Sequence, residues 1–89
     1  MSDNRHEFLL AAASEGWTVA SLPDHDHRYG RVEVKRREYG RMVYVAIETD
    51  TYGRIISAGI SYGRDRTGAR SAHSQSRQRA LAWLQGQDR

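Results

Sequence analysis

The chain has 89 residues and a formal net charge of +3, from 14 Lys or Arg and 11 Asp or Glu. This length accommodates one domain with a small hydrophobic core, so we expect a single domain over residues 1–89. Cysteine is absent, which excludes disulfides, thiolate zinc sites and thiol catalysis. The longest strongly apolar run, residues 8–13, is too short to cross a bilayer and lacks the features of a secretory signal. We therefore expect a cytoplasmic protein with no membrane segment.

Arginine dominates the basic residues: 13 of the 14 are Arg, and Lys35 is the exception. Arg binds phosphate and carboxylate groups in a bidentate manner, so this composition indicates recognition of anions or nucleic acid. The alternative is the codon bias of a GC-rich genome, and the sequence leaves both open. The net charge is −4 over residues 1–27 and +4 over each of the segments 28–41 and 63–79. The molecule is electrically polarised if the two basic segments meet in the fold.

A first helix is predicted over residues 3–15. Its apolar residues recur at helical spacing and Gly16 follows as a stop signal. These apolar residues are Phe8, Leu9, Ala12 and Ala13. Residues 17–22 then alternate enough to form a first strand, which ends at the only proline of the chain, Pro23.

Three further strands are predicted over residues 31–38, 41–49 and 54–62, because each segment alternates apolar with polar residues. The tripeptide Tyr-Gly-Arg occurs four times, and its spacings of 10, 13 and 10 residues are those of hairpin turns. The alternation predicts an antiparallel sheet with one covered face. The residues that we expect to form the core on that face are Val43, Val45, Ile47, Ile56 and Ile60.

A last helix is predicted over residues 71–85, with a narrow apolar stripe and with Gly86 as its stop signal. The stripe consists of Ala80, Leu81 and Leu84. The Gly- and Arg-rich segment 63–70 before this helix is predicted to be a mobile connection. The order of one helix, four strands and a second helix predicts an α+β two-layer sandwich. We expect an antiparallel meander with both helices packed on one face.

Residues 24–27, with the sequence Asp-His-Asp-His, are the densest group of potential metal ligands. A metal site there needs further ligands from elsewhere in the chain. We therefore interpret the segment as a solvated loop and expect no metal site. The sequence contains no nucleophile elbow, Walker motif or dinucleotide fingerprint. These observations predict a non-enzymatic protein with no catalytic residue and no cofactor.

The chain resembles double-stranded RNA-binding domains in its expected topology and in three short segments. These are residues 17–19 (Trp-Thr-Val), 23–25 (Pro-Asp-His) and 31–35 (Arg-Val-Glu-Val-Lys). The resemblance implies phosphate contacts from His25, Arg70 and Arg77. The chain departs from the family's pattern by an additional strand and by the sequence Ser-Ala-His-Ser-Gln at the start of the last helix. The likeness is therefore one of architecture, which does not by itself assign a function.

The chain is also similar to small accessory proteins of actinobacterial phages. The similar segments are residues 16–19 (Gly-Trp-Thr-Val), 53–58 (Gly-Arg-Ile-Ile-Ser-Ala) and 80–84 (Ala-Leu-Ala-Trp-Leu). This resemblance implies a phage-encoded protein that is made inside a host bacterium and acts by binding to host factors. It carries no known site over to this chain.

Two functions remain open from the sequence. The leading hypothesis is a non-enzymatic, intracellular binding module that acts on a host protein through the sheet face away from the helices. The residues expected on this partner surface are Met42, Tyr44 and Ile55. The alternative is a nucleic-acid-binding domain for double-stranded RNA or DNA, whose candidate residues are Arg31, Arg36, Arg37, Arg64, Arg66, Arg70 and Arg77. An exposed outer strand also allows a homodimer.

Overall fold

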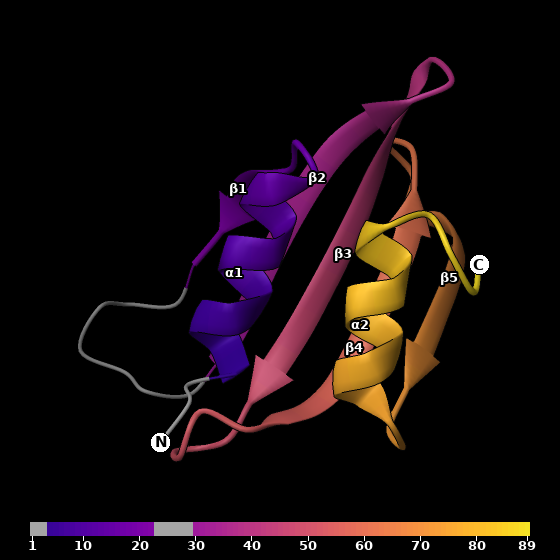
Figure 1. Ribbon diagram of the computed structural model, residues 1–89. Helices are drawn as coiled ribbons and strands as arrows, with labels where there is room; N and C mark the ends of the chain where they lie inside the picture. The colour runs from indigo at the N-terminus through magenta and orange to yellow at the C-terminus, as the bar shows by residue number, and fades with distance from the viewer. Residues whose placement is uncertain (1–3, 23–29) are drawn as a thin grey trace.

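The computed structural model describes residues 4–22 and 30–89, which fold into one sheet with a helix at each end of the chain (Figure 1). The elements are α1 (Asn4–Ser14), β1 (Thr18–Ser21), β2 (Gly30–Glu38), β3 (Arg41–Thr49), β4 (Ile55–Tyr62), β5 (Thr67–Ala72) and α2 (Ser76–Leu84). All neighbouring strands are antiparallel, and their order in the sheet is β1-β2-β3-β4-β5. Both helices lie side by side on the same face. The predicted α+β meander with both helices on one face is confirmed.

The hydrophobic core lies between the two helices and the covered face of the sheet. The alternation of apolar residues along the strands produces this face, since successive side chains of a strand point to opposite sides. Of the predicted core residues, only Ile56 is not buried on this face. The largest fully buried side chains are Phe8, Val32, Val34, Val43, Val45, Ile47, Ile60, Trp83 and Leu84.

The end of α1 places a tryptophan between the two helices. Gly16 has a φ of +82°, and the N–H of Trp17 donates to the carbonyl of Ala12 at 2.9 Å. This hydrogen-bond pattern is typical of a helix that ends at glycine. The side chain of Trp17 is buried, and its indole Nε1 donates to the carbonyl of Leu84 at 2.9 Å. The C-terminal end of α1 is therefore linked to that of α2.

The sheet contains a fifth strand, β5, where the sequence predicted a mobile connection over residues 63–70. The mobile connection is therefore a wrong prediction. β5 has no apolar alternation because it is an edge strand, of which only Ala72 is buried. It forms through backbone pairing with β4, after a tight turn in which Gly63 and Arg66 have positive φ.

The second helix is shorter than the predicted helix over residues 71–85. The first of these residues belong to β5, and Gln75 adopts the left-handed conformation, with a φ of +52°. α2 therefore begins only at Ser76. The hydroxyl of Ser76 donates to the carbonyl of Ile55 at 3.3 Å, which connects the start of α2 to the start of β4.

The start of β4 corrects the predicted core. We expected Ile56 in the core and Ile55 on the opposite face of the sheet. The pairing of β3 with β4 shifts between Glu48 and Thr49, so that Ile55 pairs with Thr49. Ile55 consequently packs against the core, while Ile56 is half exposed. A one-residue irregularity in the pairing moves the residues beyond it to the opposite face of the sheet. The alternation within β4 alone does not reveal this irregularity.

Three of the four Tyr-Gly-Arg copies lie at turns, as the sequence indicated, and the first copy begins at Tyr29, outside the described residues. In the β2–β3 hairpin, Tyr39 and Gly40 have φ of +51° and +83°. Two successive positive φ angles are typical of the type I′ turn, which matches the twist of a hairpin. The third and fourth copies place Gly53 and Gly63, also with positive φ, in the β3–β4 and β4–β5 turns.

Candidate partner-binding surface

The sheet face that carries neither helix is the candidate binding surface, and we call it the open face. Paired residues on neighbouring strands point to the same side, so the strand register defines its members. They are Thr18 and Ser21 on β1; Arg31, Glu33, Lys35 and Arg37 on β2; Met42, Tyr44, Ala46 and Glu48 on β3; Ser57, Gly59 and Ser61 on β4; and Ser71 on β5. Most are charged or small, in contrast to the aliphatic covered face.

Three of the seven candidate arginines lie on the helix side of the sheet. Arg36 stacks on the Trp17 ring at 4.6 Å from its centroid and donates to Glu38 at 2.6 Å. Arg77 of α2 pairs with a carboxylate of α1, and Arg70 donates to a carbonyl near the C-terminus at 3.3 Å. These side chains connect elements of the fold, so they are poor candidates for binding nucleic acid.

Arg31 and Arg66 meet on the open face, where both donate to Glu33. Arg66 binds the Glu33 carboxylate through two nitrogens, at 2.9 and 3.0 Å, and Arg31 Nη2 donates to it at 3.2 Å. Burial alone would raise the pKa of Glu33, but the hydrogen bonds from Arg66 and Arg31 hold it below its usual range. The two basic sequence segments therefore meet here. Glu33 is only 8% exposed, whereas Arg31 and Arg66 are 60% and 44% exposed.

The predicted partner surface is found in part. Met42 and Tyr44 lie on the open face, opposite Arg37 and Lys35 of β2, and both are partly buried. Ile55 packs against the core instead, because of the register shift at the start of β4. Arg66 lies over the Tyr44 ring, with its guanidinium carbon 3.6 Å from the ring centroid.

A basic end of the open face forms where the β2–β3 and β4–β5 turns lie. The N–H of Gly63 donates to the carbonyl of Met42 at 2.7 Å, which places the β4–β5 turn and its Arg64 beside the start of β3. Arg37 pairs with Met42 across β2 and β3. We define the basic end as Lys35, Arg37, Met42, Tyr44, Arg64 and Arg66.

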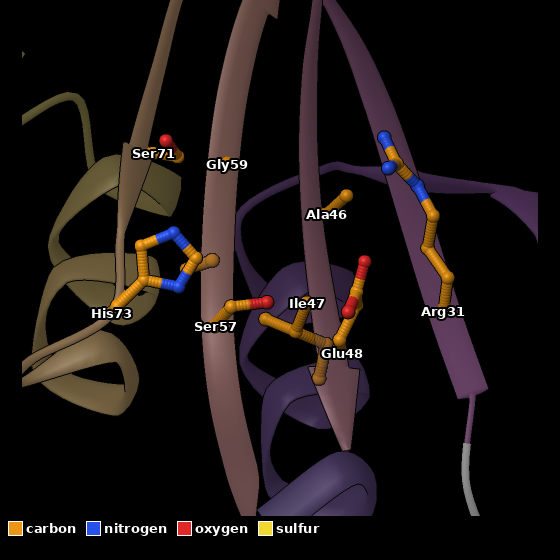
Figure 2. Close-up of a pocket in the computed structure, with 9 residues that line it drawn as sticks. Arg31, Ala46, Ile47, Glu48, Ser57, Gly59, Ser71 and His73 are labelled. Carbon is orange, nitrogen blue, oxygen red and sulfur yellow. The ribbon is translucent and has the colours of Figure 1, made fainter.

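The remainder of the open face is hollowed into a shallow trough along β3 and β4. Two hollows, of about 220 and 200 Å³, share Arg31, Ala46 and Gly59 as lining residues. Ala46 and Gly59 pair directly across the two central strands, and neither side chain extends far above the sheet. Figure 2 shows the hollow that lies farther from the basic end, with Glu48 on β3, Ser57 on β4 and His73 just after β5. We call this the far hollow.

Several surface residues were not singled out from the sequence. Glu33 reads as one polar residue among many in an alternating strand, and its two arginine partners come from segments more than 30 residues apart. Ala46 and Gly59 could have been found only by pairing two outward-facing small residues across β3 and β4, which requires the register. His73 stood in a predicted helix, whereas it follows β5.

Other predicted features are tested only in part. The Asp-His-Asp-His segment over residues 24–27, including His25, lies outside the described residues. Within residues 4–22 and 30–89, no group of three or more His, Asp or Glu side chains could hold a metal ion. Neither helix in this part of the chain is long and apolar enough to cross a membrane.

Comparison of the chain with models of protein families, with curated proteins and with solved structures gives no match in any of the three. These comparisons therefore supply no family evidence for phage accessory proteins or for double-stranded RNA-binding domains. The fold and the chemistry of the open face are the grounds on which a function can be argued.

Proposed function

We propose that this protein is a non-enzymatic binding module whose open face binds an acidic segment of a protein partner. The observation that carries the proposal is the coincidence of two predicted surfaces at the basic end. Met42 and Tyr44, expected at a protein interface, lie beside the cations Lys35, Arg37 and Arg64. Protein interfaces combine an apolar or aromatic centre with a charged rim, and positive charge steers acidic partners to such a site.

A protein partner is favoured over nucleic acid by the state of the arginines and of Tyr44. Arg31, Arg36, Arg66 and Arg77 all form ion pairs within the fold, which reduces the charge that they offer to phosphates. Single-stranded nucleic acid binds to sheets by stacking on exposed rings. The Tyr44 ring on the open face is instead covered by Arg66.

Nucleic acid binding remains the second candidate because of Arg37 and Arg64. Both side chains are exposed, and neither forms an ion pair with another described residue. Phosphate-driven binding would weaken steeply with rising salt. A gel-shift series with duplex DNA, duplex RNA and single strands at low salt tests it. We expect no shift, and a shift that the double variant Lys35→Glu/Arg37→Glu abolishes would replace the proposal.

The resemblance to phage accessory proteins is the reason for proposing a bacterial host protein as the partner. It also suggests the bacterial cytoplasm as the compartment. The absence of cysteine is compatible with this reducing compartment, in which disulfides rarely form. The test begins with capture from a nuclease-treated bacterial lysate on the immobilised chain. The retained protein is identified by mass spectrometry and purified, and its affinity is measured by calorimetry.

The decisive comparison uses two charge-reversed variants. Lys35→Glu/Arg37→Glu reverses two of the four cations of the basic end and so removes its net positive charge. Arg54→Glu/Arg79→Glu makes the same change in charge at the β3–β4 turn and on α2. We expect the first variant to weaken binding at least tenfold and the second to change it less than threefold. Equal affinity of the two variants for the purified partner would contradict the proposal.

A further inference from the structure

The far hollow brings together polar side chains that form no hydrogen bond or ion pair with a described residue, beside Arg31, which binds Glu33. Two rows of paired residues cross the sheet here. One row runs through Glu33, Ala46, Gly59 and Ser71, and the other through Arg31, Glu48 and Ser57. His73, which follows β5, lines the same hollow. The absence of a side chain at Gly59 and the single methyl of Ala46 leave the floor open between longer residues.

Hydrogen-bonding capacity is left unused around this floor. Arg31 donates to Glu33 only through Nη2, so its other N–H groups remain available for hydrogen bonds to a ligand. Within the described part of the chain, the side chains of Glu48, Ser57, Ser71 and His73 form no hydrogen bond or ion pair. Glu48 is paired in register with Arg31, yet Arg31 binds Glu33 instead.

Several other carboxylates of the described surface are paired, although Glu15 and Asp65, like Glu48, form no ion pair with a described residue. Glu38, Glu33, Glu7 and Asp50 each bind at least one arginine at 3.2 Å or less. A concave site with a few convergent polar groups is the usual form of a specific binding site. The far hollow has this form, and it is open to solvent on the side away from the helices.

The lining groups determine the chemistry of the occupant. Arg31, Ser57, Ser71 and His73 can donate hydrogen bonds, which suits a carboxylate, whereas Glu48 only accepts them and would repel an isolated anion. The occupant therefore needs an anionic acceptor with an N–H donor close to it. An acidic residue in an extended peptide has both, since its backbone N–H lies within a few bonds of its side-chain carboxylate.

We propose that the far hollow receives an acidic residue of the partner, whose carboxylate binds Arg31 and the two serine hydroxyls while a backbone N–H donates to Glu48. This inference rests on the proposed function, because it assigns a specific contact to the acidic segment that the open face binds. The basic end supplies the general attraction. The far hollow selects the position of one acidic side chain.

Gly59→Val is the variant that fills the hollow. A Cβ at Gly59 would lie 3.5 Å from the nearest backbone atom, the carbonyl oxygen of Arg70, which is an ordinary contact. The φ of Gly59 is not positive, and a β-branched residue suits a central strand. We therefore expect Gly59→Val to fold with unchanged or higher thermal stability. Ser21→Val, on the opposite edge of the sheet, is the matched control.

The probe is the peptide N-acetyl-Gly-Glu-Gly-amide, with N-acetyl-Gly-Gln-Gly-amide as its uncharged counterpart. Binding is measured by NMR titration of the full-length 15N-labelled chain. We expect shifts at the amides of Ser57, Gly59 and Ser71 with the Glu peptide, and at least fivefold weaker binding of the Gln peptide. Gly59→Val should abolish these shifts, and Ser21→Val should retain them. Equal binding of both peptides, or binding that survives Gly59→Val, would overturn the inference.

The two proposals fail in different ways. If Lys35→Glu/Arg37→Glu weakens binding of the purified partner but Gly59→Val does not, the proposed function stands and the assignment of the hollow falls. If Gly59→Val removes tripeptide binding but neither Gly59→Val nor Lys35→Glu/Arg37→Glu changes binding of the partner, the hollow binds acidic peptides, but the proposed function and the assignment of the hollow to the partner both fall. Sedimentation of the wild-type chain provides a further check. A dimer that Gly59→Val dissociates would assign the open face to a second copy and overturn both.

Discussion

Glu38 and Glu33 each lie between two arginines, but on opposite sides of the sheet. Glu38 binds Arg36 and Arg89, and the three side chains are only 13% to 24% exposed. Glu33 binds Arg31 and Arg66, of which Arg66 is 44% and Arg31 60% exposed. The same chemistry is therefore largely enclosed on the helix side and open to solvent on the other side.

The two groups also differ in what they connect. Arg36 stacks on Trp17 and donates to the carbonyl of Glu15 at 2.5 Å, while Arg89 donates to the carbonyl of Trp83 at 2.7 Å. The Glu38 group thus joins β2, the end of α1 and the C-terminus. The Glu33 group joins β2 to the β4–β5 turn and, through the stacking of Arg66 on Tyr44, to the neighbouring strand β3, all on one exposed face. An ion pair that joins several elements stabilises the fold, whereas one exposed on a single face can be exchanged for a partner.

The largest effect is expected from Glu38→Gln. The substitution keeps the shape of the side chain but leaves two enclosed arginines without a counter-charge, so we expect a loss of about 2–3 kcal/mol in the free energy of unfolding. Urea denaturation followed by circular dichroism measures it. The control is Glu48→Gln, which removes an exposed carboxylate without a partner and should change the stability by less than about 0.5 kcal/mol. Similar losses in the two variants would contradict an enclosed, structural role for Glu38.

The stability should fall in acid over a range set by Glu38. The hydrogen bond from Arg89, opposed by burial and reinforced by Arg36, lowers the pKa of Glu38 from 4.5 to about 2. A carboxyl with a lowered pKa in the folded state stabilises the fold above its unfolded pKa, and this contribution is lost as the pH falls toward the folded pKa. The difference between Glu38→Gln and the wild type should therefore be largest above pH 4.5, shrink as the pH falls, and be small near pH 2. Thermal melts at intervals between pH 2 and pH 6 test this, and a difference independent of pH would exclude the Glu38 carboxylate as its source.

Much of the fold follows from alternation and turn residues that are local in the sequence. Four of the five strands, the first helix and the glycine that ends it are visible in this way. β5 is not, because an edge strand exposed on nearly all its residues needs no apolar pattern and forms through pairing with β4. The exchange of Ile55 for Ile56 in the core also depends on pairing, since it follows from the register shift opposite Thr49.

The candidate surface is less predictable than the fold. The outward position of Met42 and Tyr44 follows from alternation, but the contact of Arg66 with both Tyr44 and Glu33 depends on the path of a turn. Arginine content alone did not separate Arg36, which holds the fold together, from Arg37, which faces solvent one residue later. Neighbouring residues of a strand point to opposite faces, so Arg36 contacts the helix side and Arg37 lies on the open face. The amino-acid composition contains no information on this difference.

A smaller effect is expected from Glu33→Gln. The Glu33 carboxylate is as enclosed as that of Glu38, but its two arginines can turn to water when the charge is removed. We expect a loss of about 1 kcal/mol in the free energy of unfolding, near the net value of a single charged hydrogen bond. Urea denaturation beside Glu38→Gln gives the comparison directly. A loss as large as that of Glu38→Gln would show that exposure of the arginines does not decide the contribution of the pair.

The smallest change in stability is expected from Arg66→Ala. This side chain is 44% exposed and lies on a turn, so its ion pair with Glu33 and its stacking on Tyr44 together contribute about 1 kcal/mol or less. The removal should nevertheless uncover the Tyr44 ring, which NMR would detect as a change in the chemical shifts of the ring protons. Arg89→Ala is the counterpart in the Glu38 group and should cost more, because Arg89 also binds the carbonyl of Trp83. If Arg66→Ala destabilises the chain as much as Arg89→Ala does, the Glu33 group is part of the structural framework and is not free to exchange its arginines for a partner.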